Sequence, residues 1–181
     1  MVAAISNLPD HTNEGKVLVK WSELPILASQ WREGLFNWGE THKLSERINL
    51  TAFTAKLSTL AIGGVPSFTA SATDFWVAFE TTPDKADKLD RAAIQQLDAN
   101  VPVAAQWVFY AGKEIYNCEE NTQGLSEGLW NWEAGFGKAR WNFWKQRANW
   151  VGEQQKLSKA TREVALKMVE KMDEVEIADS S

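Results

Sequence analysis

The sequence predicts an all-α fold, a single compact helical domain of six or seven helices. Apolar residues recur at spacings of three and four along most of the chain, which is the period of an amphipathic helix. No segment shows the strict alternation of a half-buried strand, and a length of 181 residues suits one domain. The domain is expected to span residues 18–175, between a flexible N-terminal arm at residues 1–17 and a flexible tail at residues 176–181.

The first half of the domain is expected to supply three helices. A helix over residues 22–38 carries leucines and tryptophans on one face, and Gly39 ends it. The next helix, over residues 45–62, begins at Ser45, a favourable N-cap residue. Its apolar arc is so broad that neighbouring elements are expected to surround it. A short helix over residues 71–80 then carries three aromatic side chains.

The second half is expected to contain the most buried helix. A helix capped by Asp84 is expected to break at Pro102, because a proline inside a helix removes a hydrogen bond and costs ~3 kcal/mol. The run that follows, residues 101–116, is apolar on most sides. A tryptophan-rich helix is expected within residues 137–150, and a last amphipathic helix over residues 158–175 begins at a serine cap.

Tryptophan is the unusual feature of the composition, with ten residues in the chain. Each ring can bury ~150–250 Å², and protein interiors are packed with almost no voids. For any single ring a place in the core is the favoured account, but ten are hard to fit that tightly into a small domain. An aromatic-lined cavity is therefore a hypothesis beside the alternative that the rings only fill the core. The cavity would suit an apolar small molecule. The candidate ligand-binding residues are Trp107, Tyr110, Trp141, Trp144 and Arg140.

Charge and cysteine content exclude several classes of function. A net charge of −5 argues against a nucleic-acid partner, which usually meets a basic face. No apolar stretch approaches the ~20 residues that cross a bilayer, and no secretory signal is present, so a cytoplasmic protein is expected. The single cysteine, Cys118, and the two distant histidines, His11 and His42, give no metal-ligand spacing. No nucleotide or nucleophile motif occurs, so neither a metal nor a cofactor is expected.

Arg140 and Tyr110 are the candidate catalytic residues. A guanidinium beside indole rings is able to bind a carboxylate or polarise a carbonyl. A phenol on a buried helix needs a hydrogen-bond partner, which is either a ligand or a neighbouring side chain. The structural alternative for Arg140 is stacking on the rings or surface pairing with a glutamate such as Glu133 or Glu153.

Four segments resemble a fungal family of proteins of unknown function described as OpdG-like. They are WSELPILASQWR at 21–32, RINLTAFTAKL at 47–57, LDANVPVAAQWVFYAGKEIY at 97–116 and RWNFWKQR at 140–147. Their order and spacing also resemble the family. The resemblance implies an all-helical, cytosolic domain with a place in fungal secondary metabolism. It brings no catalytic motif, so no active-site residue is carried over.

Two functions of different class fit these observations. In the first, the domain binds an apolar small molecule and catalyses a cofactor-free cyclisation or isomerisation by holding the substrate in its reactive shape. In the second, it is a non-enzymatic protein–protein interaction module, with Trp130 and Trp132 of the glycine-rich loop 117–137 as anchors. The clustering of aromatic residues on expected helices favours the first function. The oligomeric state is left open.

Overall fold

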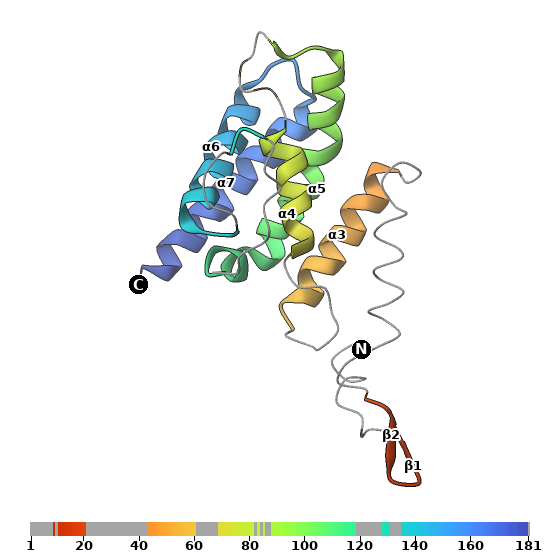
Figure 1. The fold of residues 1–181 in the computed structure, drawn as a ribbon. Coiled ribbons are helices and arrows are strands. Elements are labelled where there is room, and N and C mark those ends of the chain that lie inside the picture. Colours follow the sequence, from red (N-terminus) through yellow and green to blue (C-terminus); the bar gives the residue numbers. More distant parts are fainter. Residues whose placement is uncertain are drawn as a thin grey trace. The chain divides into compact units, whose positions relative to one another are not determined.

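The chain divides into two units, Met1–Phe68 and Thr69–Ser181, which are described separately. A computed structural model gives the architecture of each unit (Figure 1). The described residues are 9, 11–20, 43–60, 69–81, 83, 85, 88–118, 128–130 and 135–180.

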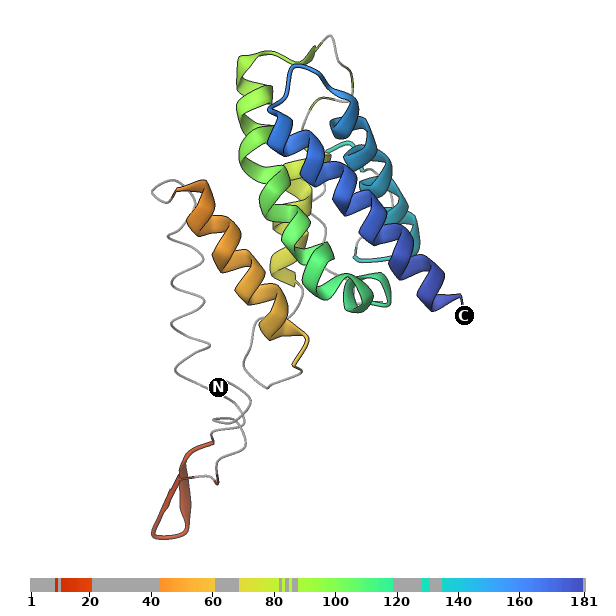
Figure 2. The same cartoon turned by 180° about the vertical axis from the view of Figure 1, so that it is seen from behind.

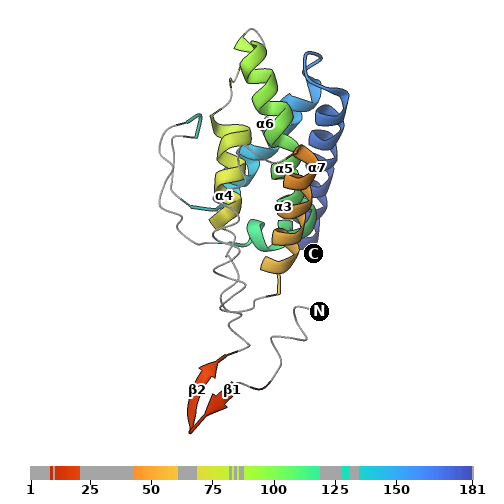
Figure 3. The same ribbon diagram turned by 90° about the vertical axis from the view of Figure 1, so that its right-hand side faces the viewer.

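A β-hairpin lies within the first unit. Strands β1 (His11–Asn13) and β2 (Lys16–Val19) pair antiparallel (Figure 3). The two residues between them, Glu14 and Gly15, both have positive φ, at 50° and 79°. This is the conformation of a type I′ turn, whose twist matches that of paired strands. The hairpin departs from the all-α prediction, because strands of three and four residues are too short to show an alternating pattern.

The helix of the first unit, α3 (Leu44–Ser58), agrees with the predicted helix over 45–62 in type. Its N-cap is Lys43 rather than Ser45. The Glu46 carboxylate turns back and accepts a hydrogen bond from the Lys43 backbone N–H at 3.1 Å, which satisfies a donor before the first turn. The helix predicted over 22–38 lies outside the described residues.

The second unit is a helical bundle. Helix α4 (Thr69–Phe75) continues into a π-helical segment, η2 (Trp76–Glu80). Three long helices follow, α5 (Arg91–Tyr116), α6 (Lys138–Glu153) and α7 (Lys159–Asp179). Helix α7 contacts both α5 and α6, and the α4–η2 segment contacts the same two helices from the opposite side (Figures 2 and 3).

The expected break at Pro102 is wrong, because this residue lies inside α5. Pro102 and its neighbours are buried, and burial of apolar surface offsets the lost hydrogen bond. The helix is instead distorted at Ala111, with φ −137° and ψ 19°, next to Gly112. Its N-cap is Asp90, whose carboxylate accepts from the Ala93 N–H at 2.8 Å, and Asp84, the predicted cap, lies outside the described residues.

The described residues therefore contain five α-helices, and the predicted count of six or seven is not matched. The serine cap of the last helix is present, with the Ser158 hydroxyl accepting from the Thr161 N–H at 3.1 Å. Helix α7 continues to Asp179, through most of the tail expected at 176–181. Within the described part of the chain, no helix combines the length and apolar character needed to cross a membrane.

Candidate functional site

A buried ion pair lies at the centre of the second unit. Glu80 is the last residue of η2, and its carboxylate accepts hydrogen bonds from Arg140 Nε at 2.8 Å and Arg140 Nη2 at 2.9 Å. Trp144 Nε1 donates to the same carboxylate at 2.7 Å. The third guanidinium nitrogen, Nη1, donates to the Gly135 carbonyl at 2.9 Å. The two charged side chains are 1% and 4% exposed, so the pair is withdrawn from water.

A second arginine of α6 holds the backbone at the same point. Arg147 Nε donates to the Phe79 carbonyl at 3.1 Å, and its Nη2 donates to the Pro83 carbonyl at 2.7 Å. The Glu80 carbonyl accepts from the Leu129 N–H at 2.7 Å. Carbonyls at a helix C-terminus have no partner inside the helix and carry partial negative charge. A guanidinium placed there supplies both a hydrogen-bond donor and a positive charge, so Arg140 and Arg147 together fix the end of η2 against α6.

Trp144 is enclosed by protein groups. Its ring stacks on Phe75 with centroids 4.2 Å apart and meets the edge of Phe136 at 6.0 Å. The Arg140 guanidinium lies 5.3 Å from the ring centroid. These contacts and the bond to Glu80 assign a packing role to Trp144 in this structure.

The other buried candidates have separate surroundings. Trp107 Nε1 donates to Asp74 Oδ2 at 2.7 Å, and Trp141 Nε1 donates to Glu176 Oε1 at 2.9 Å. Both rings are buried, whereas Tyr110 is 42% exposed. The structure thus brings Arg140 and Trp144 together and places Trp107, Trp141 and Tyr110 at other points.

A groove lies on the surface between α5 and α7. Its volume is about 400 Å³. Of the predicted ligand-binding residues, Tyr110 lines it. Apolar atoms of Val108, Phe109, Gly112, Val175 and Ala178 share the lining with the charged side chains of Lys113, Glu114, Lys171, Glu174 and Asp179.

Trp141 lies directly behind this groove. A Cβ atom added to Gly112 would be 3.6 Å from Trp141 Cη2 and 3.4 Å from Val175 Cγ2. Gly112 also follows the distorted residue Ala111, so the helix both bends and lacks a side chain here. The far edge of the Trp141 ring is therefore separated from the groove by backbone and one valine.

The rim of the groove carries both signs of charge. Lys171 pairs with Glu174 at 2.7 Å along α7, and Lys138 of α6 pairs with Asp179 at 2.9 Å. The hydrogen bond from Lys138 holds the pKa of Asp179 below its ordinary value, and the same bond raises the pKa of Lys138. A hollow whose lining combines apolar atoms with charged side chains suits a ligand that has both apolar and polar groups.

Glu80, the partner of Arg140, was not among the residues predicted from the sequence. The two residues are 60 positions apart, so no local spacing connects them. The available signal was a carboxylate at the end of a strongly aromatic helix, where an unpaired charge would be costly. Of the expected loop anchors, Trp130 is half-buried with its ring 5.4 Å from Phe143, and Trp132 lies outside the described residues.

Metal-ligand clusters were not expected from the sequence. Among the described residues, no group of three or more histidine, cysteine, aspartate or glutamate side chains is placed to hold a metal ion. Cys118 is a half-buried thiol without a disulfide. His42 lies outside the described residues.

The fold and the buried network define a mostly helical domain whose second unit is built around an arginine–glutamate pair. The family model described as Protein of unknown function (DUF3632) matches residues 1–148, and the chain belongs to that family. The match includes Glu80, Arg140 and Trp144 and ends within α6, before α7. No curated protein and no solved structure matches the chain.

Proposed function

We propose that the protein binds an apolar small molecule in the groove between α5 and α7. The observation that carries this proposal is the groove itself, at about 400 Å³, in which apolar and charged residues share the lining. Sites for small molecules have volumes of ~300–1,000 Å³, lined mainly by apolar groups with a few polar ones. The groove replaces the tryptophan-lined cavity expected from the sequence as the place where a ligand binds.

The free energies of apolar burial and of binding indicate what kind of ligand the groove holds. The groove exposes nearly as much polar as apolar surface, and each ~100 Å² of apolar area removed from water contributes only ~2.5 kcal/mol. A micromolar dissociation constant requires ~8 kcal/mol. The apolar lining therefore accounts for weak binding, and polar contacts from the rim supply the remainder. An amphipathic molecule fits this requirement better than a hydrocarbon.

The catalytic part of the proposal is a cofactor-independent cyclisation or isomerisation. Tyr110 is the catalytic candidate that borders the groove, and the residue is 42% exposed. Arg140, the other candidate, has all three guanidinium nitrogens bonded to Glu80 and Gly135. The polarising hydrogen bond is therefore assigned to Tyr110, while the groove holds the substrate in its reactive shape.

The origin of the protein is also part of the proposal. The four segments that resemble the OpdG-like family support a fungal protein with a place in secondary metabolism. A cytoplasmic location accompanies that assignment.

The test compares two substitutions on neighbouring positions of α7. Ala178 lines the groove, and Ile177 is 68% exposed next to it. Ala178→Phe is expected to fill the groove and weaken binding at least tenfold, whereas Ile177→Phe leaves binding unchanged. Small molecules that co-purify with the protein are identified by mass spectrometry, and their rebinding is followed by quenching of tryptophan emission.

Two results would contradict the proposal. Equal binding by wild type and Ala178→Phe would show that the groove is not the site. Absence of any apolar compound that co-purifies or quenches would remove the small-molecule function and favour the interaction module, in which Trp130 and the exposed Leu129 beside it contact a partner protein.

A further inference from the structure

A carboxylate of the chain already occupies a cationic and aromatic site on α6. Glu176 of α7 accepts a hydrogen bond from Trp141 Nε1 at 2.9 Å and from Lys145 Nζ at 2.7 Å. Lys145 also pairs with Asp173, one turn earlier on α7. An indole N–H and an ammonium that converge on one carboxylate form a charge-assisted arrangement, which is stronger than a neutral hydrogen bond.

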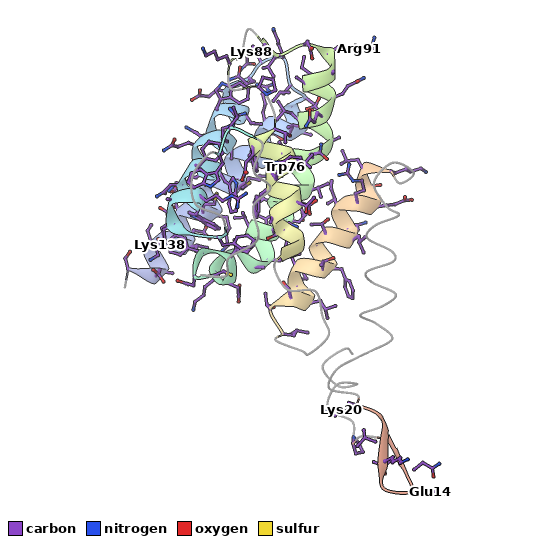
Figure 4. The ribbon with its side chains drawn as sticks, in the orientation of Figure 1. Glu14, Lys20, Trp76, Lys88, Arg91 and Lys138 are labelled. Carbon is purple, nitrogen blue, oxygen red and sulfur yellow. The ribbon has the colours of Figure 1, made fainter. Side chains whose placement is uncertain are left out.

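The same pattern continues at the next turn. Lys138 pairs with Asp179 at 2.9 Å, and its ammonium lies 4.7 Å from the centroid of the Tyr116 ring. Figure 4 shows Lys138 beside the end of α7. Residues 138, 141 and 145 share one face of α6, since they are spaced at i, i+3 and i+7. This face supplies two ammonium groups and an indole N–H, and α7 supplies the acids.

The end of α7 is held mainly by these charges. Val175 is its last buried apolar residue, and the next large apolar residue, Ile177, is exposed to solvent. Exposed ion pairs contribute ~0–1 kcal/mol each, and salt screens them. The last turn of α7 therefore detaches from α6 more readily than the part of the helix that precedes Val175.

We propose that Trp141 and Lys145 form a binding site for the carboxylate of an apolar ligand, and that Glu176 is an internal occupant which the ligand displaces. The site is distinct from the groove, because Trp141 lies behind the Gly112 backbone and the described residues that line the groove come from α5 and α7 alone. A carboxylate meets the Lys145 ammonium and the Trp141 N–H, and an apolar body next to it meets the indole ring. The inference goes beyond the proposed function, and it names the ligand class as an aromatic or aliphatic monocarboxylate.

The displacement of Glu176 by the ligand exchanges one carboxylate for another beside Lys145. When the ligand carboxylate takes the place of Glu176, Lys145 and the Trp141 N–H keep an anionic acceptor. Glu176 moves with the last turn of α7 into water, where an ionised carboxylate is well solvated. The ligand gains the apolar contact with the Trp141 ring, which Glu176 does not make to the same extent because its stem is short.

The experiment uses benzoate as the probe and benzamide as its uncharged counterpart. Binding is followed through the indole N–H signal of Trp141 in ¹H–¹⁵N spectra, assigned with Trp141→Phe. Glu176→Ala vacates the site and is expected to bind benzoate about fivefold more tightly than wild type, the factor that corresponds to one exposed ion pair. Benzamide is expected to bind Glu176→Ala and the wild-type protein with the same affinity.

Two variants complete the design. Glu163→Ala is the matched control, since it removes one carboxylate of α7 whose partner, Lys159, is on the same helix, and Glu163 does not line the groove. It is expected to leave benzoate binding unchanged. Lys145→Met in the Glu176→Ala background is expected to abolish the gain. An equal gain in Glu163→Ala, or no gain in Glu176→Ala, overturns the inference.

A measurement on the wild-type protein covers the case in which Glu176→Ala does not fold. Amide exchange of residues 176–179 is expected to accelerate about fivefold between low and high salt, while exchange of residues 165–172 does not change. Equal behaviour of the two segments overturns the inference. If a neutral apolar probe binds the groove but benzoate gains nothing from Glu176→Ala, the proposed function stands and only the carboxylate site is lost.

Discussion

Arg140 of α6 and Glu80 of η2 form a bidentate ion pair, with Nε–Oε1 at 2.8 Å and Nη2–Oε2 at 2.9 Å, although they are 60 positions apart in the chain. Burying two charges carries a desolvation penalty, which is repaid only when the remaining hydrogen-bond groups are also satisfied. Here Trp144 and the Gly135 carbonyl supply those partners. The pair therefore fixes the register of η2 on α6.

Removing either partner of this pair is expected to destabilise the protein strongly. Arg140→Met and Glu80→Leu each leave an uncompensated buried charge, at a cost of ~3–5 kcal/mol. The double variant is expected to lose less than the sum of the two, because it contains no unpaired charge. Urea unfolding of the four proteins measures the coupling. Additive losses would show that the two side chains do not act as a pair.

Two glycines in helices are expected to respond to alanine in opposite directions. A Cβ at Gly152 would be 2.5 Å from Leu166 Cδ2 and 2.7 Å from its Cγ, so Gly152→Ala forces the Leu166 side chain of α7 to move away from α6. The expected loss is ~1–3 kcal/mol. At Gly112 the nearest atom is 3.4 Å away, so Gly112→Ala is expected to gain up to ~1 kcal/mol from helix propensity. Thermal melting decides the sign of each change, and two shifts of the same sign would contradict this account of the packing.

The contact between Gly128 and η2 predicts a local effect. A Cβ at Gly128 would lie 2.8 Å from the Glu80 carbonyl oxygen, which accepts from the Leu129 N–H. Gly128→Ala is therefore expected to break this hydrogen bond and cost ~1 kcal/mol. Gly137→Ala is the control, since that position is extended at φ 178° and has open space around it. Faster amide exchange at Leu129 in the first variant alone is the expected result.

The sequence predicted those elements whose signal is local. The serine cap at Ser158 and the tryptophan-rich helix α6 both follow from short-range spacing. The pairing of Arg140 with Glu80 does not follow from such spacing, because it depends on where two helices that are distant in the sequence meet. The position of Pro102 inside α5 was also not predicted. The hydrogen bond that a proline removes from a helix is evident from the sequence, whereas the burial that offsets this loss depends on the tertiary packing. The groove beside Tyr110 lies next to the distortion at Ala111, which no residue pattern predicts.

The ion pair between Lys138 and Asp179 gives the pH dependence of the end of α7. The hydrogen bond from Lys138 lowers the pKa of Asp179 from its ordinary value of 3.8, and the bond to Asp179 raises the pKa of Lys138 from 10.5. A lowered acid pKa stabilises the folded end above pH 3.8, and this contribution is lost as the pH falls through the pKa of the folded state. A raised lysine pKa stabilises it below pH 10.5, and that contribution is lost as the pH rises through the folded value. The end of α7 is thus expected to stay docked between these limits.

Carboxyl ¹³C titration of Asp179 tests the pair directly. In Lys138→Met the pKa of Asp179 is expected to rise toward its ordinary value, because the ammonium that favours the ionised form is gone. Lys171→Met provides the comparison, since Lys171 pairs with Glu174 and is expected to leave the titration of Asp179 unchanged. An Asp179 midpoint that is the same in wild type and Lys138→Met would mean that the contact does not hold α7 to α6 in solution. The turn that carries Glu176 would then be free of this restraint at every pH, and the displacement of Glu176 by a carboxylate ligand would have to overcome only the contacts with Trp141 and Lys145.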